Sequence, residues 1–143
     1  MTPLQSPSVN EVSYCLDTNI VSEVLRKNPV VNQRLQSELD KGNKVFISSI
    51  VYYEIVRGLK AAGASNKLKG FMQIYRVLAK LPLNMAAIEK AIDIYVDLHK
   101  GNQIEDNDIY IAAIAMANDC TLVTANEKHF CRINGLIFEN WKR

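Results

Sequence analysis

Residues that build disulfide frameworks and zinc sites are scarce in this sequence. Three cysteines and two histidines occur among 143 residues, and no two cysteines form a Cys-x-x-Cys pair. An odd number of widely spaced cysteines indicates reduced thiols and argues against a disulfide framework. Because His99 and His129 lie far apart and in no ligand-type pattern with the cysteines, a zinc site is not expected either.

Long apolar runs and an excess of charge of one sign are also missing. No run approaches the roughly 18 apolar residues of a membrane span, and no basic region followed by an apolar stretch opens the sequence. Seventeen Lys and Arg against fifteen Asp and Glu leave a formal charge of +2, which does not mark a general nucleic-acid or membrane binder. We therefore expect a cytoplasmic protein that does not associate with membranes.

The length and the hydrophobic content are sufficient for one domain. Of the 143 residues, 48% are hydrophobic, so the chain can bury one sizeable core. Pro3, Pro7 and several polar residues precede the first apolar run. We expect a loose leader at residues 1–12 and a single domain over residues 13–143.

Short apolar runs alternate with amphipathic segments along this domain. The runs predicted to be strands are residues 14–16, 45–47, 121–123 and 136–138. The segments predicted to be helices are residues 20–28, 29–42, 50–62, 68–78, 88–95 and 109–117. This alternation predicts an α/β fold with a mainly parallel central sheet and helices on both faces. The apolar stripes are expected to face the core, which places Tyr75, Ile92 and Tyr95 inside, and Trp141 is expected there too.

Polar residues follow the predicted strands, where ligands bind in open α/β sheets. Asp17 ends the first strand, Asp106 and Asp108 begin a buried helix, and Asn126 follows the next strand. Each acid also has an ordinary alternative role, because Asp commonly caps helices and is favoured at their positive N-termini. Taken alone, these residues leave capping and catalysis as equal alternatives.

Glu54 is the most informative acid because it interrupts the apolar residues 50–56. An ionised carboxylate in such surroundings is costly without a partner. One alternative is an ion pair with Arg57 on the next turn of the helix. The apolar neighbours on both sides leave no clear polar face, which favours a functional role.

Acids gathered from several strand ends repel one another and therefore require a cation. Oxygen ligands without Cys or paired His favour Mg²⁺ or Mn²⁺. Such an ion can activate water for phosphodiester hydrolysis and neutralise charge on the phosphate. Basic side chains could form a positive rim around this site; they are Arg26, Arg57, Lys60, Lys100, Lys128 and Arg132. His129 is expected to be an ordinary surface residue.

Five segments carry a resemblance to a known family. They are YCLDTNIVSEVLR (14–26), SSIVYYEIVRGL (48–59), IEDNDIYIAAIAMA (104–117), LVTANEKHF (122–130) and GLIFENW (135–141). In this order they make the sequence resemble, from Tyr14 onward, the PIN-domain family, and within it the VapC-type toxins of prokaryotic toxin–antitoxin pairs. The resemblance implies a PIN-like three-layer sandwich.

The resemblance also implies roles for individual residues. Asp17, Glu54 and Asp108 match the metal-binding acids of the family. Asn126 stands where many relatives have a fourth acid, so the number of bound metals stays open, and Asp106 matches an acid that only some relatives carry.

Supporting residues and partners follow from the same resemblance. Thr124 and Asn19 are expected to support the site, Thr124 by orienting a carboxylate or a water, although Thr124 could equally just end its strand. The implied protein is a Mg²⁺-dependent endoribonuclease, commonly a homodimer, whose site is blocked by a co-encoded antitoxin.

Three other readings remain open. A PIN nuclease for RNA maturation would have the same site and no antitoxin. A receiver-type signalling domain also uses strand-end acids and Mg²⁺, but the sequence has no strand-end Lys for the phosphoryl group and no adjacent acid pair ending the first strand. A binding module that kept the fold and lost catalysis would leave Glu54 without a metal to bind.

Overall fold

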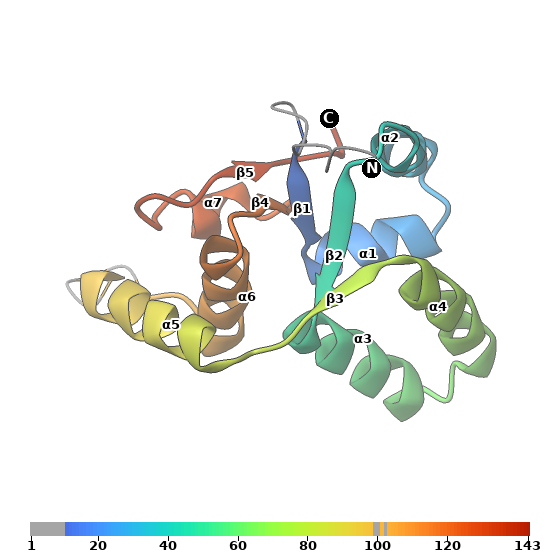
Figure 1. The fold of residues 1–143 in the computed structure, drawn as a ribbon. Helices are drawn as coiled ribbons and strands as arrows, with labels where there is room; N and C mark the ends of the chain where they lie inside the picture. The colour runs from blue at the N-terminus through green and yellow to red at the C-terminus, as the bar shows by residue number, and fades with distance from the viewer. Residues whose placement is uncertain (1–10, 99–100, 102) are drawn as a thin grey trace, which may run out of the picture.

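The protein forms a five-stranded parallel sheet surrounded by helices (Figure 1). The parallel sheet and its helices were predicted, but the strand at Ala79–Leu81 was not. The computed structural model describes residues 11–98, 101 and 103–143. The strand order is β3-β2-β1-β4-β5. The strands are β1 (Ser13–Leu16), β2 (Lys44–Ser48), β3 (Ala79–Leu81), β4 (Thr121–Val123) and β5 (Phe138–Glu139).

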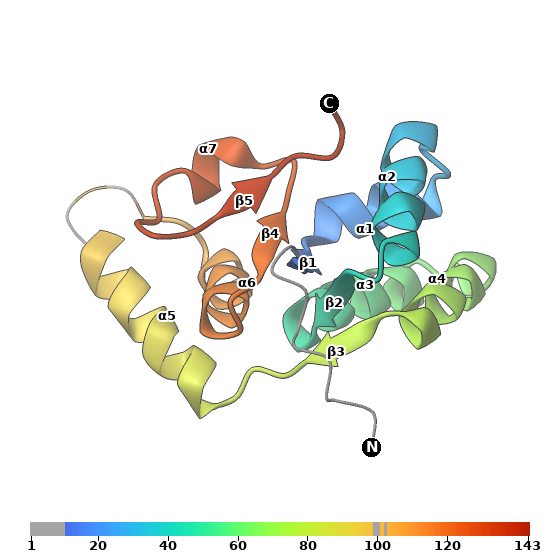
Figure 2. The same ribbon diagram turned by 45° about the horizontal axis from the view of Figure 1, so that its top comes forward.

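Helices cover both faces of this sheet and connect its strands. They are α1 (Thr18–Leu25), α2 (Pro29–Asp40), α3 (Ser49–Ala61), α4 (Ser65–Val77), α5 (Met85–Leu98), α6 (Asp106–Ala117) and α7 (Glu127–Phe130). Figures 1 and 2 show α1 to α4 gathered around β1, β2 and β3, while α5 and α6 lie together beside β4. The predicted fold class is therefore confirmed, and the carboxyl ends of all five strands point the same way.

The core runs through the middle of the sheet and along α6. Five successive residues of this helix, 111–115, are fully buried, as predicted from its apolar sequence. Trp141, which follows β5, is also buried and packs edge-on against Tyr14 with 5.2 Å between ring centroids. The Arg34 guanidinium lies over the Trp141 ring, 5.1 Å from its centroid. The last residues of the chain are thereby fastened to the central strand.

Some element boundaries differ from those predicted. The last strand is Phe138–Glu139, because pairing with β4 begins at Phe138 opposite Leu122. The buried helix begins at Asp106, as expected for Asp106 and Asp108, and so extends one turn before the apolar segment 109–117; the Ile109 amide donates to the Glu105 carbonyl in this turn. The four-residue helix α7 was not predicted, because one turn is too short to show a period.

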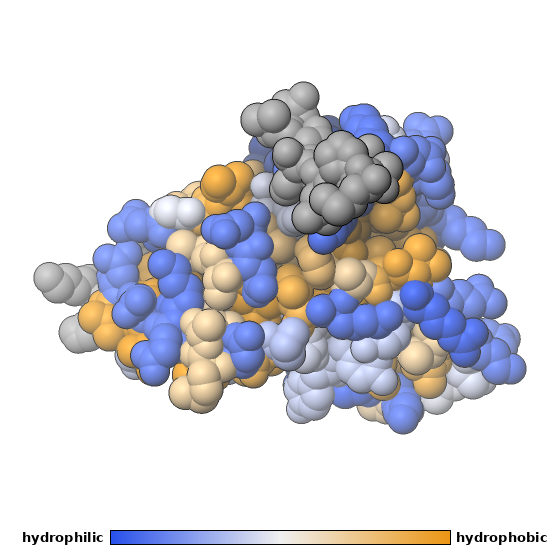
Figure 3. Space-filling model, viewed as in Figure 1, coloured by the Kyte–Doolittle hydropathy of each residue, from blue (hydrophilic) through white to orange (hydrophobic). Residues whose placement is uncertain are grey.

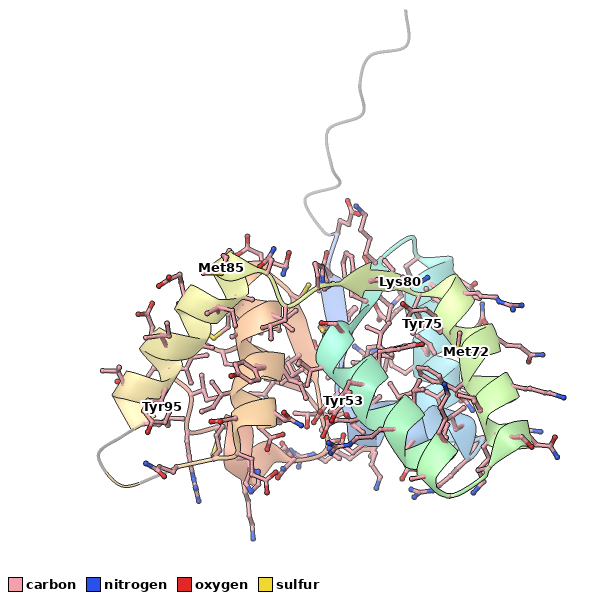
Figure 4. The ribbon with its side chains drawn as sticks, turned by 90° about the horizontal axis from the view of Figure 1, so that it is seen from below. Tyr53, Met72, Tyr75, Lys80, Met85 and Tyr95 are labelled. Atoms are coloured by element: carbon pink, nitrogen blue, oxygen red, sulfur yellow. The ribbon has the colours of Figure 1, made fainter. Side chains whose placement is uncertain are left out.

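The orientation predicted for part of α5 was wrong. This helix packs on α6 through the face that carries its alanines, so Ala87, Ala91 and Ile94 are buried. Ile92 and Tyr95 lie on the other side and are 51% and 50% exposed. Figure 4 shows Met85 and Tyr95 on α5, and Figure 3 shows hydrophobic residues among hydrophilic ones over this region. Apolar residues surround most of α5, so the sequence pattern could not tell which side faces the core.

Most of the predicted leader lies outside the described residues, as do His99 and Lys100. Within the leader, the amide of Val12 donates to the Asn43 side chain at 3.1 Å.

The three cysteines are free thiols, as expected. In the part of the chain that the structure describes, no helix is both long and apolar enough to cross a membrane.

Candidate catalytic site

Asp17 is the centre of the candidate site and is almost completely buried. It is the first residue after β1, and its amide continues the pairing with β4 by donating to the Val123 carbonyl at 2.9 Å. Its side chain caps α1, because Oδ1 accepts from the Thr18 amide at 2.8 Å. With only 4% of its surface exposed, Asp17 both begins the helix and presents a carboxylate at the carboxyl end of the central strand.

Thr124 and Asn19 hold the second oxygen of this carboxylate. The Thr124 hydroxyl donates to Asp17 Oδ2 at 2.7 Å, and the Asn19 amide donates to the same oxygen at 3.2 Å. Asn19 also accepts from the Ala125 amide, while the Thr124 hydroxyl accepts from the Asn126 amide. The predicted supporting residues therefore connect the ends of β1 and β4 and fix the Asp17 carboxylate in one orientation.

Glu54 lies on the second turn of α3 and faces α1. Its Oε1 accepts a hydrogen bond from the Thr18 hydroxyl at 2.8 Å, so one residue contacts both Asp17 and Glu54. The alternative ion pair with Arg57 is not among the salt bridges of the described residues. The Arg57 guanidinium instead lies 4.8 Å from the ring centroid of Tyr53. Glu54 is thus directed toward the strand ends and is available to a ligand there.

Asp108 approaches from the first turn of α6 and contacts a residue that sequence reasoning missed. His129 Nδ1 lies 3.1 Å from Asp108 Oδ2 and 2.8 Å from Asn126 Nδ2. Nδ1 can donate to the carboxylate only when it carries a proton and can accept from the amide only when it does not. One feature of the sequence could have indicated this contact: Asn126 and His129 lie one helical turn apart, directly after a predicted strand.

The charges of these acids act on one another. The pKa of Asp17 is raised to about 6, chiefly by burial, and the nearby carboxylates of Asp108 and Glu54 contribute to this rise. The hydrogen bonds from Thr124 and Thr18 oppose this rise by stabilising the ionised form. Burial outweighs these hydrogen bonds, so the site holds a carboxylate that a cation would stabilise.

The donor set fits a hard divalent cation by its chemistry. All three acids offer carboxylate oxygens from neighbouring elements, and among the described residues no thiol or paired imidazole competes with them. Among the described residues, however, no three acidic, histidine or cysteine side chains stand close enough to hold one ion as they are placed. Glu54 and Asp108 would therefore have to turn from Thr18 and His129 toward Asp17 to complete a shared set of ligands.

Asp106 is not brought to this cluster. It is exposed and lies at a groove between α5 and α6, together with Tyr95 and Tyr110. Asn126 is at the start of α7, close to the site through Thr124 and His129. The sequence therefore pointed to one acid, Asp106, that the fold directs to a different surface.

Comparison with known proteins agrees with the observed fold. Residues 14–136 match the PIN domain family. The chain is 35% identical over 135 residues to Ribonuclease VapC2 of Rickettsia felis, covering 91% of this chain and 98% of that protein. It is 28% identical over 134 residues to Ribonuclease VapC1 of Haemophilus influenzae strain R2866, with 91% and 98% covered.

Solved structures show the same likeness. The crystal structure of VapBC2 from Rickettsia felis bound to a promoter DNA fragment contains a similar chain, with a TM-score of 0.82, 33% identity and coverage of 91% and 99%. VapBC-1 from nontypeable Haemophilus influenzae gives a TM-score of 0.81 at 27% identity, with 92% and 100% covered. This chain therefore belongs to the PIN-domain family and, within it, to the VapC-type proteins.

Proposed function

We propose that this protein is an endoribonuclease and the toxin of a toxin–antitoxin pair. The observation that carries the proposal is the buried Asp17 carboxylate, which is held at the central strand end with Glu54 and Asp108 close enough to raise its pKa. Relatives that align over nearly their whole length are named ribonucleases of the VapC type. A receiver-type phosphorelay role has no such support.

PIN-domain ribonucleases generally depend on a divalent metal, and we propose Mg²⁺ or Mn²⁺ for this chain. Asp17, Glu54 and Asp108 would hold the ion through their carboxylate oxygens. When bound, such an ion neutralises phosphate charge and activates a water molecule for hydrolysis. Thr124 and Asn19 would keep Asp17 oriented for this role, because both donate to its Oδ2.

The residues around Asp108 complete the proposed site. His129 would hold Asp108 through Nδ1, in the manner of outer partners that orient metal-binding carboxylates. Asn126 would occupy the fourth position as a neutral group, which attracts a second cation less than a carboxylate does. Asp106, exposed on the α5 side of its helix, would contribute to the surface and not to the ligands.

Two protein partners belong to the proposal. The similar chains of known structure include VapBC toxin–antitoxin complexes, which favours a cognate antitoxin here. A second copy of the chain would cover the exposed apolar residues of α5, among them Ile92, Tyr95 and Val96. An RNA-maturation nuclease would have the same site and no antitoxin, so a small reading frame next to this gene separates the two functions.

RNA cleavage by the purified protein tests the proposed activity. The wild type is expected to cut a mixed cellular RNA pool with Mg²⁺ and not with EDTA. Asp17→Asn and Asp108→Asn are expected to abolish cutting, whereas Asp93→Asn, an exposed acid on α5, should cut like the wild type. A folded wild type that neither binds Mn²⁺ nor cuts RNA would support the binding-module alternative instead.

A further inference from the structure

A groove of about 340 Å³ opens beside the acid cluster, between α1, α3 and α4. Thr18 and Glu54 line one end of it, and the Thr18 hydroxyl donates to Glu54 there. The groove and the proposed metal site therefore share Glu54, and Thr18 contacts both Glu54 and Asp17. A ligand seated in the groove lies next to any group that reacts at the acids.

The inner surface of the groove is apolar. Leu25 comes from α1, and Ile55 and Leu59 come from α3. Gly58 also lines the groove, and a Cβ atom added to it would meet no atom within 4 Å. Because Gly58 has no side chain, the groove has open space next to its apolar side chains. This space suits a flat ring better than a charged group.

The outer surface of the groove is polar and positively charged. Arg26 and Lys67 line it and are both exposed. Arg26 has Glu23 as a partner at 3.2 Å, but its side chain is 72% exposed and remains accessible. These two cations stand beside a cluster that is otherwise acidic, so the charge around the groove suits a ligand that carries phosphate.

We propose that this groove binds the nucleobase of an unpaired RNA nucleotide next to the scissile phosphate. The base lies against Leu25, Ile55 and Leu59, and Arg26 and Lys67 contact the flanking phosphates. This assignment rests on the proposed ribonuclease function and adds a subsite to it.

Size and chemistry favour a base over a protein segment. The volume is near the lower end of small-molecule sites, roughly 300–1,000 Å³, and so fits one nucleotide. Sequence-specific RNA recognition targets unpaired bases that stack on flat or apolar side chains. The hydroxyls of Thr18 and Ser22 in the same groove supply hydrogen-bonding groups for the polar edge of the base.

Filling the groove at Gly58 tests the proposal. Gly58→Leu places a side chain in the open space, and Gly58→Ala places one methyl group there. Both should fold, because glycine inside a helix is less favourable than alanine or leucine. Gly70→Ala is the matched control, since it changes a glycine in α4 that does not line the groove and whose added Cβ would only touch Leu25 at 4.0 Å.

The assay is cleavage of an RNA library with a randomised unpaired segment, followed by sequencing of the fragment ends. The wild type and Gly70→Ala should show a base preference at one position flanking the cut. Gly58→Leu should lose this preference and raise KM at least about tenfold, the scale of one lost base contact, with kcat changed much less. Gly58→Ala should have a base preference and a KM between those of the wild type and Gly58→Leu.

Anisotropy of a labelled RNA oligonucleotide provides a readout that does not need cleavage. In the Asp108→Asn background, adding Gly58→Leu should weaken RNA binding by a similar factor. If Gly58→Leu keeps the base preference and the KM of the wild type, the subsite is wrong while the ribonuclease function stands. If it cuts RNA normally but escapes a co-expressed antitoxin, the groove binds protein and the proposal is overturned. A wild type that cuts no RNA would refute the proposed function itself.

Discussion

Replacing Asp17 by Asn should stabilise the protein while removing its activity. The pKa of Asp17 rises from 3.8 to about 6 in the folded state. Since one pKa unit corresponds to about 1.36 kcal/mol, keeping this carboxylate ionised costs the fold about 3 kcal/mol at neutral pH. Asparagine removes the charge but turns an NH₂ group toward the donors Thr124 and Asn19, which costs about 1 kcal/mol. The net gain is about 2 kcal/mol, or roughly 4–8 °C in Tm.

The pH dependence of this gain identifies its cause. Because the folded pKa is raised, the contribution of Asp17 to the stability of the wild type falls as pH rises from about 4 to about 6 and stays low above that range. In thermal unfolding with EDTA, Asp17→Asn should therefore have a higher Tm than the wild type at pH 7.5 but not at pH 4.5. Asp93→Asn, which alters an exposed carboxylate, should leave Tm within about 1 °C at both pH values.

Addition of Mg²⁺ should make the wild type more stable than Asp17→Asn, which reverses their order of stability in EDTA. The wild type gains stability by binding the ion, by about 1.4 kcal/mol for each tenfold excess over Kd, and the variant without the carboxylate gains little. An Asp17→Asn variant that is less stable than the wild type in EDTA at pH 7.5 would show that the ionised Asp17 carboxylate does not destabilise the fold. So would a gain of equal size at both pH values.

Four further predictions concern single side chains. Thr124→Val removes the hydroxyl that donates to Asp17 and should lower RNA cleavage more than tenfold, while Thr124→Ser retains it; equal activity of both variants would contradict the role of this hydrogen bond. His129→Ala should weaken Mn²⁺ binding, measured by calorimetry, by about 10–100-fold, and unchanged affinity would remove His129 from the site. Tyr95→Arg should convert a dimer to a monomer in sedimentation without unfolding it; a persistent dimer would place the interface elsewhere. Trp141→Ala should lower the urea unfolding free energy by about 3–5 kcal/mol, and a loss below 1 kcal/mol would show that the end of the chain is not part of the core.

The strand ends could be predicted because several local signals agree there. The run before Asp17 is apolar, the residues after it favour a helix start, and the same pattern recurs at Ser48. Glu54 was identified because an ionised carboxylate among apolar residues is energetically costly without a partner. In these places the local preference and the global fold point to the same structure.

The remaining features depend on contacts between distant parts of the chain. Asp106 and Asp108 are two residues apart, and only the packing of α5 on α6 decides that Asp106 faces the α5 groove while Asp108 faces His129. His129 looks like a surface residue until α7 brings it to Asp108. Tyr95 is exposed because the small residues of α5 make the closer contact with α6. Sequence periodicity carries no information about which neighbour a helix will meet.

The hydrogen bond between Asp17 and Thr124 joins residues 107 positions apart. Asp17 leaves the ribosome early in synthesis, but the strand and threonine that complete its surroundings are made only after the great majority of the described chain. Parallel pairing of such distant strands is also slow to form. A nascent or truncated chain that ends before β4 therefore carries Asp17, Glu54 and Asp108 but lacks the strand and the threonine that hold Asp17 in place, so the proposed site becomes complete only near the end of synthesis.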